Sequence, residues 1–125
     1  MASVSEIYSR KSPNPIFICD VSPTRGSNFA PLEIAQEVGA DFLCVAYSPG
    51  KSVRVESSAI AHILKQRGND VIFNLACRDM NKLAIQNHLL GAQVLGLENV
   101  IVVKGDDFTE DELTNVKDVN DYQST

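Results

Sequence analysis

The sequence lacks any run of lysine or arginine residues, and its overall charge is acidic. It contains 11 Lys and Arg residues against 16 Asp and Glu residues, which gives a formal net charge of −5 at pH 7. Proteins that bind nucleic acid need clustered cations to neutralise the phosphates. We therefore expect no nucleic-acid partner for this chain.

Long apolar segments are also missing. No apolar stretch reaches the roughly 18 residues that a membrane span needs, so we expect no membrane partner. Residues 1–14 are polar and lack the apolar centre of a secretory signal. We interpret them as a frayed lead-in to a domain that occupies residues 15–125, and a cytoplasmic location is the default expectation.

Only three cysteines are present, Cys19, Cys44 and Cys77. Their odd number and wide spacing argue against a disulfide framework and against a zinc site with paired ligands, so we expect no metal site. Each cysteine lies in or at the end of an apolar run. We interpret all three as small buried hydrophobic residues.

The sequence does contain four short apolar runs, at residues 16–21, 41–47, 71–77 and 100–104. They are rich in β-branched and aromatic residues and do not alternate, which is typical of parallel strands covered on both faces. Segments with helical periodicity lie between them, at residues 31–38, 55–67 and 80–95. The repeated strand–helix order predicts an α/β fold with about four parallel strands and three intervening helices.

Each predicted helix has an identifiable end. The glycines that follow the three periodic segments favour a helix stop, and they are Gly39, Gly68 and Gly96. Asp79 precedes the third helix as its predicted N-cap. Residues 105–125 are polar and acidic, and residues 109–112 are equally compatible with a short capped helix and with a loop.

Periodicity alone leaves two architectures open. One is a small doubly wound sheet, and the other is part of a (β/α)8 TIM barrel, which normally needs about 250 residues. No G-x-G-x-x-G sequence follows the first strand, which weakens the interpretation as a dinucleotide-binding fold. In both architectures ligands bind at the carboxyl ends of the strands.

Two polar residues lie inside the apolar runs, Asp20 and Asn74. Such groups are costly to bury unless they are paired or used. Position alone is equally compatible with a satisfied core group and with a ligand contact. Further polar residues follow the ends of all four runs, which favours a site at that rim.

Five segments, in chain order, carry a resemblance to a known family. They are residues 17–25 (FICDVSPTR), 41–47 (DFLCVAY), 74–79 (NLACRD), 89–100 (LLGAQVLGLENV) and 104–106 (KGD). Together they resemble the first half of the methylenetetrahydrofolate reductases. The resemblance covers about residues 15–125, and it implies the N-terminal half of a (β/α)8 barrel that holds FAD at its carboxyl rim.

The resemblance also implies roles for individual residues. Asp20 would be the acid that protonates the folate, and Asp106 would be an acid whose negative charge favours a cationic intermediate. The implied cofactor-binding residues are Tyr47, Pro49, Asn74, Lys104, Gly105, Asp106 and Gln123. The family usually has Glu in place of Asp20, His in place of Asn74 and Arg in place of Lys104.

The implied activity is the reduction of the folate substrate 5,10-methylenetetrahydrofolate to 5-methyltetrahydrofolate, with NAD(P)H as electron donor and FAD as hydride carrier. A half barrel leaves open sheet edges, so we expect a homo-oligomer or a missing C-terminal half to complete it. A non-catalytic flavin- or folate-binding module or subunit is an alternative. A generic β/α scaffold without a ligand is a third interpretation.

Overall fold

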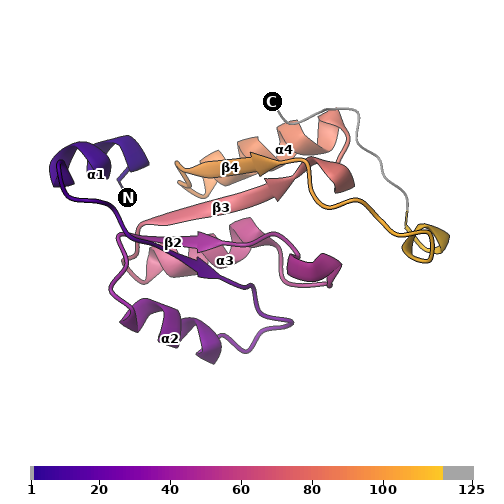
Figure 1. Cartoon of the computed structure of the whole chain (residues 1–125), viewed down its shortest axis with the longest axis horizontal. Helices are drawn as coiled ribbons and strands as arrows, with labels where there is room; N and C mark the ends of the chain where they lie inside the picture. Colours follow the sequence, from indigo (N-terminus) through magenta and orange to yellow (C-terminus); the bar gives the residue numbers. More distant parts are fainter. Residues whose placement is uncertain (1, 117–125) are drawn as a thin grey trace.

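The computed structural model describes residues 2–116, which form an open sheet flanked by helices (Figure 1). The helices are α1 (Val4–Lys11), α2 (Ala30–Glu37), α3 (Ser57–Gln66) and α4 (Lys82–Val94), and the strands are β1 (Ile18–Val21), β2 (Phe42–Val45), β3 (Val71–Ala76) and β4 (Val100–Val103). Short 3-10 helices are η1 (Pro49–Lys51), η2 (Cys77–Asp79) and η3 (Glu112–Thr114). Within this part of the chain, no helix has the length and apolar character that crossing a membrane requires.

The four strands are parallel and pair in chain order, β1–β2–β3–β4. The crossover helices α2, α3 and α4 all pack on the same side of the sheet. A doubly wound sheet would reverse its strand order at a switch point and carry crossover helices on both faces. The described strands show neither feature, so the architecture is a partial (β/α)8 barrel, as one of the two predictions had it.

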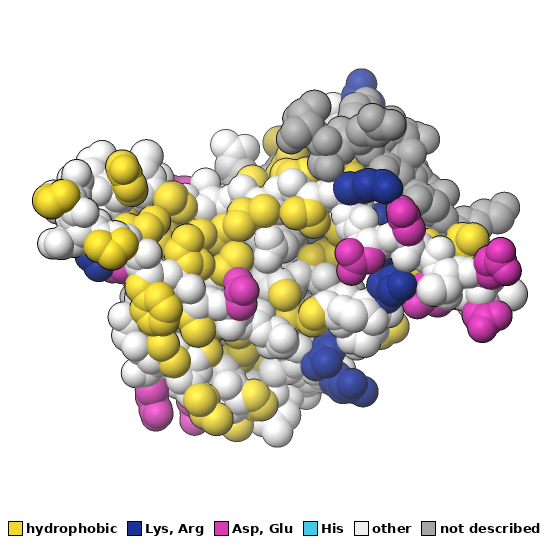
Figure 2. Space-filling view, viewed as in Figure 1, with side chains coloured by type: hydrophobic (Ala, Val, Ile, Leu, Met, Phe, Trp, Pro, Cys, Tyr) yellow, Lys and Arg dark blue, Asp and Glu magenta, His cyan; other side chains and the backbone are white. Residues whose placement is uncertain are grey.

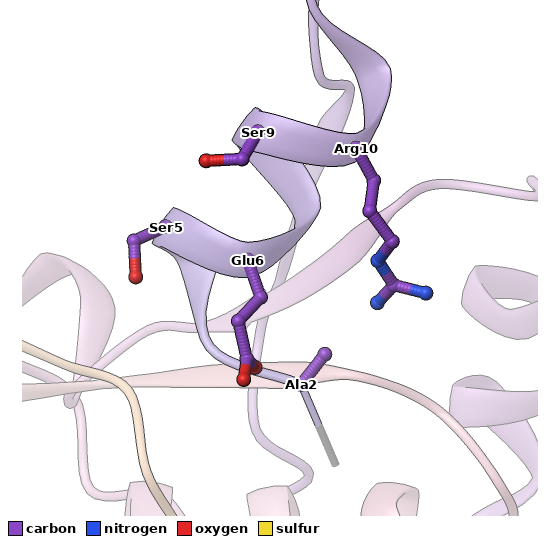
Figure 3. Close-up of a pocket in the computed structure, with 5 residues that line it drawn as sticks. All are labelled: Ala2, Ser5, Glu6, Ser9 and Arg10. Carbon is purple, nitrogen blue, oxygen red and sulfur yellow. The ribbon is translucent and has the colours of Figure 1, made fainter.

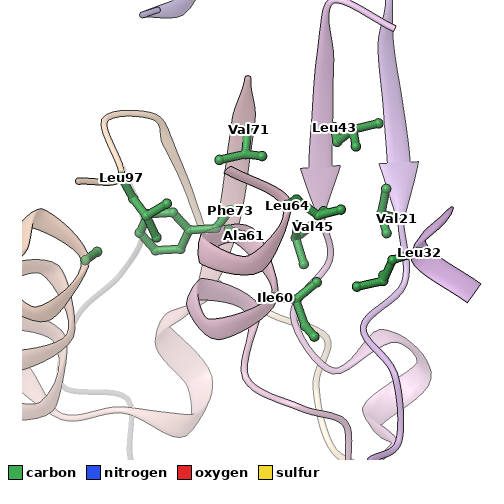
Figure 4. Packing of buried hydrophobic residues seen from close by; sticks show 11 residues of the cluster. Val21, Leu32, Leu43, Val45, Ile60, Ala61, Leu64, Val71, Phe73 and Leu97 are labelled. Carbon is green, nitrogen blue, oxygen red and sulfur yellow. The ribbon is translucent and has the colours of Figure 1, made fainter. Parts of the chain in front are cut away.

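The main core lies between the sheet and the crossover helices (Figure 4). Val45 and Phe73 point from β2 and β3 toward the helices, where they meet Ile60 and Leu64 of α3 and Leu32 of α2. None of these five side chains is more than 1% exposed. Side chains of a strand alternate between its two faces, so the neighbours of Val45 and Phe73 in their strands point to the opposite face of the sheet.

That opposite side, which we call the interior face, carries a smaller apolar cluster. Phe42, Cys44 and Ile72 are buried there, and Val4 and Ile7 of α1 pack against them. Figure 2 views this face and shows hydrophobic side chains extending from α1 across the sheet, with charged side chains gathered beyond the carboxyl ends of the strands. The helix α1 therefore packs at the amino end of the interior face, away from the carboxyl rim.

The N-terminal segment is not the frayed lead-in that its polar composition suggested. Its helix begins with a capping box, in which Ser3 and Glu6 exchange hydrogen bonds. The Asn99 side chain accepts a backbone N–H of α1 at 3.0 Å, and Asp70 accepts the N–H of Ala2 at 2.8 Å. The prediction failed because these hydrogen bonds to distant residues, together with the packing of α1 on the interior face, hold the segment in place.

The two edge strands are less covered than predicted. β2 is buried at every residue and β3 at every residue except Asn74. β1 is buried only at Val21, and all four residues of β4 are exposed, Val102 by 42%. Coverage on both faces is thus correct for the central strands and wrong for the edges, because the described helices pack mainly against β2 and β3.

The helix ends agree with the prediction at the C-termini and differ at one N-terminus. The three glycines follow their helices with positive φ of 71°, 91° and 71°, and they are Gly39, Gly68 and Gly96. Asp79, the predicted N-cap of α4, lies instead in η2. Asn81 is the actual N-cap, because the Asp79 carboxylate is paired with Arg78.

Replacing Phe73 with alanine should lower the free energy of unfolding by about 3–5 kcal/mol, the usual cost of emptying a buried aromatic site. Phe73 is 1% exposed at the centre of the main core. Urea unfolding followed by circular dichroism measures the change. Val53→Ala is the control, since Val53 is 92% exposed and should change the stability by no more than about 0.5 kcal/mol. Equal losses in the two variants would contradict this packing.

Candidate functional site

A pocket lies where β2, β3 and β4 reach their carboxyl ends, and we call it the rim pocket. It has a volume of about 330 Å³ and is lined by Tyr47, Ala76, Arg78, Val103, Gly105 and Asp106. These residues come from three segments that are distant in sequence. The parallel register brings the segments together because it aligns the ends of neighbouring strands on one rim.

The turn after β4 depends on glycine. Gly105 has a φ of +92°, in the left-handed region that residues with a Cβ rarely adopt. A Cβ at this position would lie 3.1 Å from the Cβ of Arg78 and 3.4 Å from the Cβ of Ala76. The turn therefore lies directly against the end of β3.

Arg78 connects the end of β3 to this turn, and it is only 6% exposed. Its backbone N–H donates to the carbonyl oxygen of Lys104 at 2.8 Å, and its Nη1 donates to the carbonyl oxygen of Asp106 at 2.9 Å. The guanidinium carbon lies 4.5 Å from the centre of the Phe108 ring, within the range of a cation–π contact. One side chain thus contacts the segment between residues 104 and 108 at several points.

The charge of Arg78 is balanced by the next residue. Asp79 accepts from Nε of Arg78 at 2.9 Å and from Nη2 at 2.7 Å. This forked hydrogen bond lowers the pKa of Asp79 and raises that of Arg78. Tyr47 lies nearby, and its burial, together with the negative charge of Asp79, raises the pKa of its phenol to about 12.

A second group of polar side chains lies on the interior face. Asp20 is the register partner of Cys44, so the two side chains share that face. Asn74 donates from Nδ2 to the carbonyl oxygen of Val45 at 2.9 Å and contacts Cys44 Sγ at 3.5 Å. Burial raises the pKa of the Cys44 thiol. Asp20 itself is exposed, so its carboxylate is open to a bound molecule.

Two lysines flank the rim pocket. Lys104 pairs with the Asp107 carboxylate at 2.8 Å. Lys51, which ends η1, donates to the carbonyl oxygen of Asp107 at 3.2 Å and pairs with Glu112 at 2.9 Å. Thr109 and Glu112 also exchange hydrogen bonds, so residues 109–112 lead into the 3-10 helix η3. The acidic segment after β4 is thereby held beside the rim.

A larger hollow, of about 640 Å³, lies beside α1 (Figure 3). Its lining comes entirely from α1 and the residue at its start: Ala2, Ser5, Glu6, Ser9 and Arg10. It lies at the amino ends of the strands, and its Glu6 carboxylate already caps the helix. Ligands of β/α barrels bind at the opposite rim, so the rim pocket is the better candidate.

Comparison of the sequence with known protein families identifies the family of this chain. A family model described as methylenetetrahydrofolate reductase matches residues 28–124, which is more than half of the chain. The chain belongs to the methylenetetrahydrofolate reductase family. Neither the curated proteins nor the solved structures contain a significant match to it.

The match to the methylenetetrahydrofolate reductase family covers every residue of the rim pocket. It supports an oxidoreductase-like enzyme of one-carbon metabolism. Members of this family generally use FAD and NAD(P)H. Asp20 lies before the matched stretch, so its assignment depends on the residues around it. The family assignment thus agrees with the partial barrel that the strand order indicates.

The structure brings some of the predicted reductase site residues together and keeps others apart. Tyr47, Gly105 and Asp106 line the rim pocket. Asp20 and Asn74 share the interior face with Cys44, while Pro49 and Lys104 lie on the loops that follow β2 and β4. Asp20 is in β1, at the opposite edge from β4, and three strand spacings put these edges about 14 Å apart. Gln123 lies outside the described residues.

Sequence reasoning missed Arg78 and assigned Asp79 the wrong role. Both were visible as charged residues directly after an apolar strand, where a barrel places its ligand-binding loops. The helical periodicity that begins near Met80 made Asp79 look like a helix cap. The forked pairing with Arg78, which the one-dimensional pattern does not contain, determines its actual position.

The residues of the rim fit the FAD that this family uses. The half-buried Tyr47 ring supplies an aromatic wall, and the Gly105 turn, packed against the end of β3, supplies main-chain atoms to the lining. Lys51 and Lys104 are cations beside the pocket, and a diphosphate would compete with the carboxylates that now pair with them. A volume of about 330 Å³ is at the lower end for small-molecule sites, so the rim pocket would hold one part of the cofactor.

Spectrophotometric titration should reveal Tyr47 as a phenol that ionises at about pH 12. Since this pKa lies above the ordinary value of 10.0, the neutral phenol stabilises the fold below pH 10, and this contribution is lost as the pH rises toward 12. The late phase of tyrosinate absorbance should disappear in Tyr47→Phe and persist in Tyr8→Phe. A late phase that survives in Tyr47→Phe would assign the shift to another residue.

Proposed function

We propose that this chain forms the FAD-binding half of a methylenetetrahydrofolate reductase, which reduces 5,10-methylenetetrahydrofolate to 5-methyltetrahydrofolate with NAD(P)H. The observation that supports this most directly is the rim pocket: Tyr47, Gly105 and Asp106 converge at the carboxyl ends of a partial barrel, inside the stretch that matches the family. Bound FAD would supply the hydride chemistry. The tasks left to the chain are binding, orientation and charge.

The binding roles follow from the chemistry of each side chain. Tyr47 would contact the flavin ring, and Gly105 would let the turn pack against the end of β3, where Asp106 lines the same pocket. Lys104, with Lys51 beside it, would attract the diphosphate. Pro49 starts the short helix that carries Lys51 to the rim. Asn74 would contribute from the interior face, where its amide is already oriented by Val45.

The two carboxylates have different tasks. The exposed Asp20 would deliver a proton to the folate nitrogen whose bond to the methylene bridge breaks, which is a general-acid role. Asp106 lines the rim pocket, and its negative charge would stabilise the cationic folate that this bond cleavage produces. The free thiols of Cys19, Cys44 and Cys77 suit the reducing cytoplasm, where we place the enzyme.

A second candidate function is a flavin- or folate-binding module without catalysis. Asp20 and Asp106 lie at opposite edges of the sheet, about 14 Å apart across three strand spacings, and this separation favours it for the chain by itself. The two carboxylates would then approach one another only when a barrel closes around them. Binding without turnover is the expected behaviour of such a module.

We also propose that the exposed edges β1 and β4 are covered by further β/α units, from another copy of the chain or from a C-terminal half. All four residues of β4 are exposed and apolar, and such an edge favours pairing. Sedimentation velocity of the chain should show a species heavier than the 13.6 kDa monomer. Val102→Lys should shift it toward the monomer. A monomer at every concentration would exclude self-association and leave a second half as the partner.

FAD binding and turnover test the proposed function. The purified chain should bind FAD, measured by quenching of flavin fluorescence, and Lys104→Gln should raise the Kd by about tenfold or more, since hydrogen bonds to charged groups contribute about 1.5–3 kcal/mol. Arg10→Gln is the control, because Arg10 lies on α1 at the other end of the strands. If the chain does not bind FAD, the proposal is wrong.

Turnover separates the two candidate functions. In the assembled protein, Asp20→Asn should retain FAD but lose most of its reduction of methylenetetrahydrofolate, whereas NAD(P)H oxidation with menadione as acceptor should continue. This result follows because Asp20 is assigned to the folate step and not to the flavin. Flavin binding without any folate reduction by the unaltered protein would favour the binding module.

A further inference from the structure

Arg78 is a charged side chain that is 94% withdrawn from solvent, at the edge of the rim pocket. Burying a charge is costly unless it is paired and hydrogen-bonded. Each of the nitrogens Nε, Nη1 and Nη2 has a partner, in the Asp79 carboxylate or the Asp106 carbonyl. Three of the five guanidinium N–H groups therefore have acceptors, and the forked pairing with Asp79 balances the charge.

The contacts of Arg78 converge on the segment that follows β4. The main-chain N–H of Arg78 donates to the carbonyl oxygen of Lys104, and its side-chain Nη1 donates to that of Asp106, so the two bonds lie on both sides of Gly105. The Phe108 ring stacks on the guanidinium, and the Arg78 Cβ fills the space beside Gly105. Because these contacts use the backbone and one ring, none of them involves the Asp106 carboxylate or the Lys104 ammonium group, which pairs with Asp107.

The fold itself does not require this arrangement. Strands β3 and β4 are already joined by the register pairs from Phe73–Val100 to Ala76–Val103. Helix α4 starts at its own N-cap, Asn81. The segment that Arg78 holds lies beyond the last paired residue of β4, at the pocket rather than in the core.

We propose that Arg78 is a positioning residue for the cofactor. It holds the Lys104–Phe108 segment in the conformation that presents Gly105 and Asp106 to the rim pocket, and Asp79 fixes the guanidinium in turn. The inference rests on the proposed FAD site and adds to it the residue that prepares the turn for binding. A lysine cannot take this role, because it lacks the planar fork that bonds two partners in fixed directions.

The decisive variant is Arg78→Lys, which keeps the charge and removes the fork. Arg67→Lys is the matched control, since Arg67 makes an exposed side-chain hydrogen bond to Gln36 at 3.1 Å. Two measurements are made on the full chain, below the thermal midpoint of every variant. One is the ¹H–¹⁵N spectrum of the backbone amides, and the other is the Kd for FAD by fluorescence titration.

In Arg78→Lys, the amide resonances of residues 105–108 should shift while those of the core strands β2 and β3 stay in place, and the Kd for FAD should rise at least tenfold. The control should show neither change. A merely structural arginine would lower the thermal midpoint without a selective shift at residues 105–108. Phe108→Leu provides a second variant if Arg78→Lys does not fold, and it should move the same resonances and raise the Kd by a smaller factor.

Two results would overturn the inference. Unchanged resonances at residues 105–108 would show that Arg78 does not hold the turn. Shifted resonances with an unchanged Kd would show that the turn does not need Arg78 in order to bind FAD. If the unaltered chain binds no FAD, the proposed function fails first, and the cofactor part of the inference fails with it, whereas the spectrum still decides whether Arg78 holds the turn.

Discussion

Parallel pairing in chain order is the constraint that determines where the functional groups lie. Each strand of the sheet ends on the same rim, so the loops after β2, β3 and β4 meet although they are distant in sequence. The register places Asn74 within hydrogen-bonding distance of β2 and Arg78 beside the turn after β4. If the strand order were reversed at any point, as in a doubly wound sheet, these groups would no longer share one rim.

The stability of the described chain is concentrated in the centre of the sheet. β2 and β3 are packed between α3 on one face and α1 on the other, whereas β1 and β4 are largely accessible. The polar residues with proposed roles divide in the same way. Asn74 is ordered by the well-packed centre, while Asp20 and Asp106 lie at the two less covered edges. Their relative placement is therefore the property most dependent on whatever covers those edges.

Sequence patterns predicted the fold well and the site only partly. Apolar runs around Phe73 and Val102 identified the strands, and the glycines at 39, 68 and 96 identified the helix ends, because both signals are local. The burial of each strand could not be read in this way, since it depends on position within the sheet. The choice between barrel and doubly wound sheet needed the strand order, to which the family resemblance pointed and which the register established.

The least predictable features are those in which a polar group meets a distant partner. Arg78 looked like one more loop residue, and its role emerges only from contacts some 30 positions further along the chain. The anchoring of the first helix by Asn99 is a further case. Asn99 holds the backbone on both sides of residue 3 with one amide group. Because synthesis proceeds from the amino end, α1 is made 95 residues before its partner Asn99, so these hydrogen bonds can form only after the ribosome has completed β3 and α4.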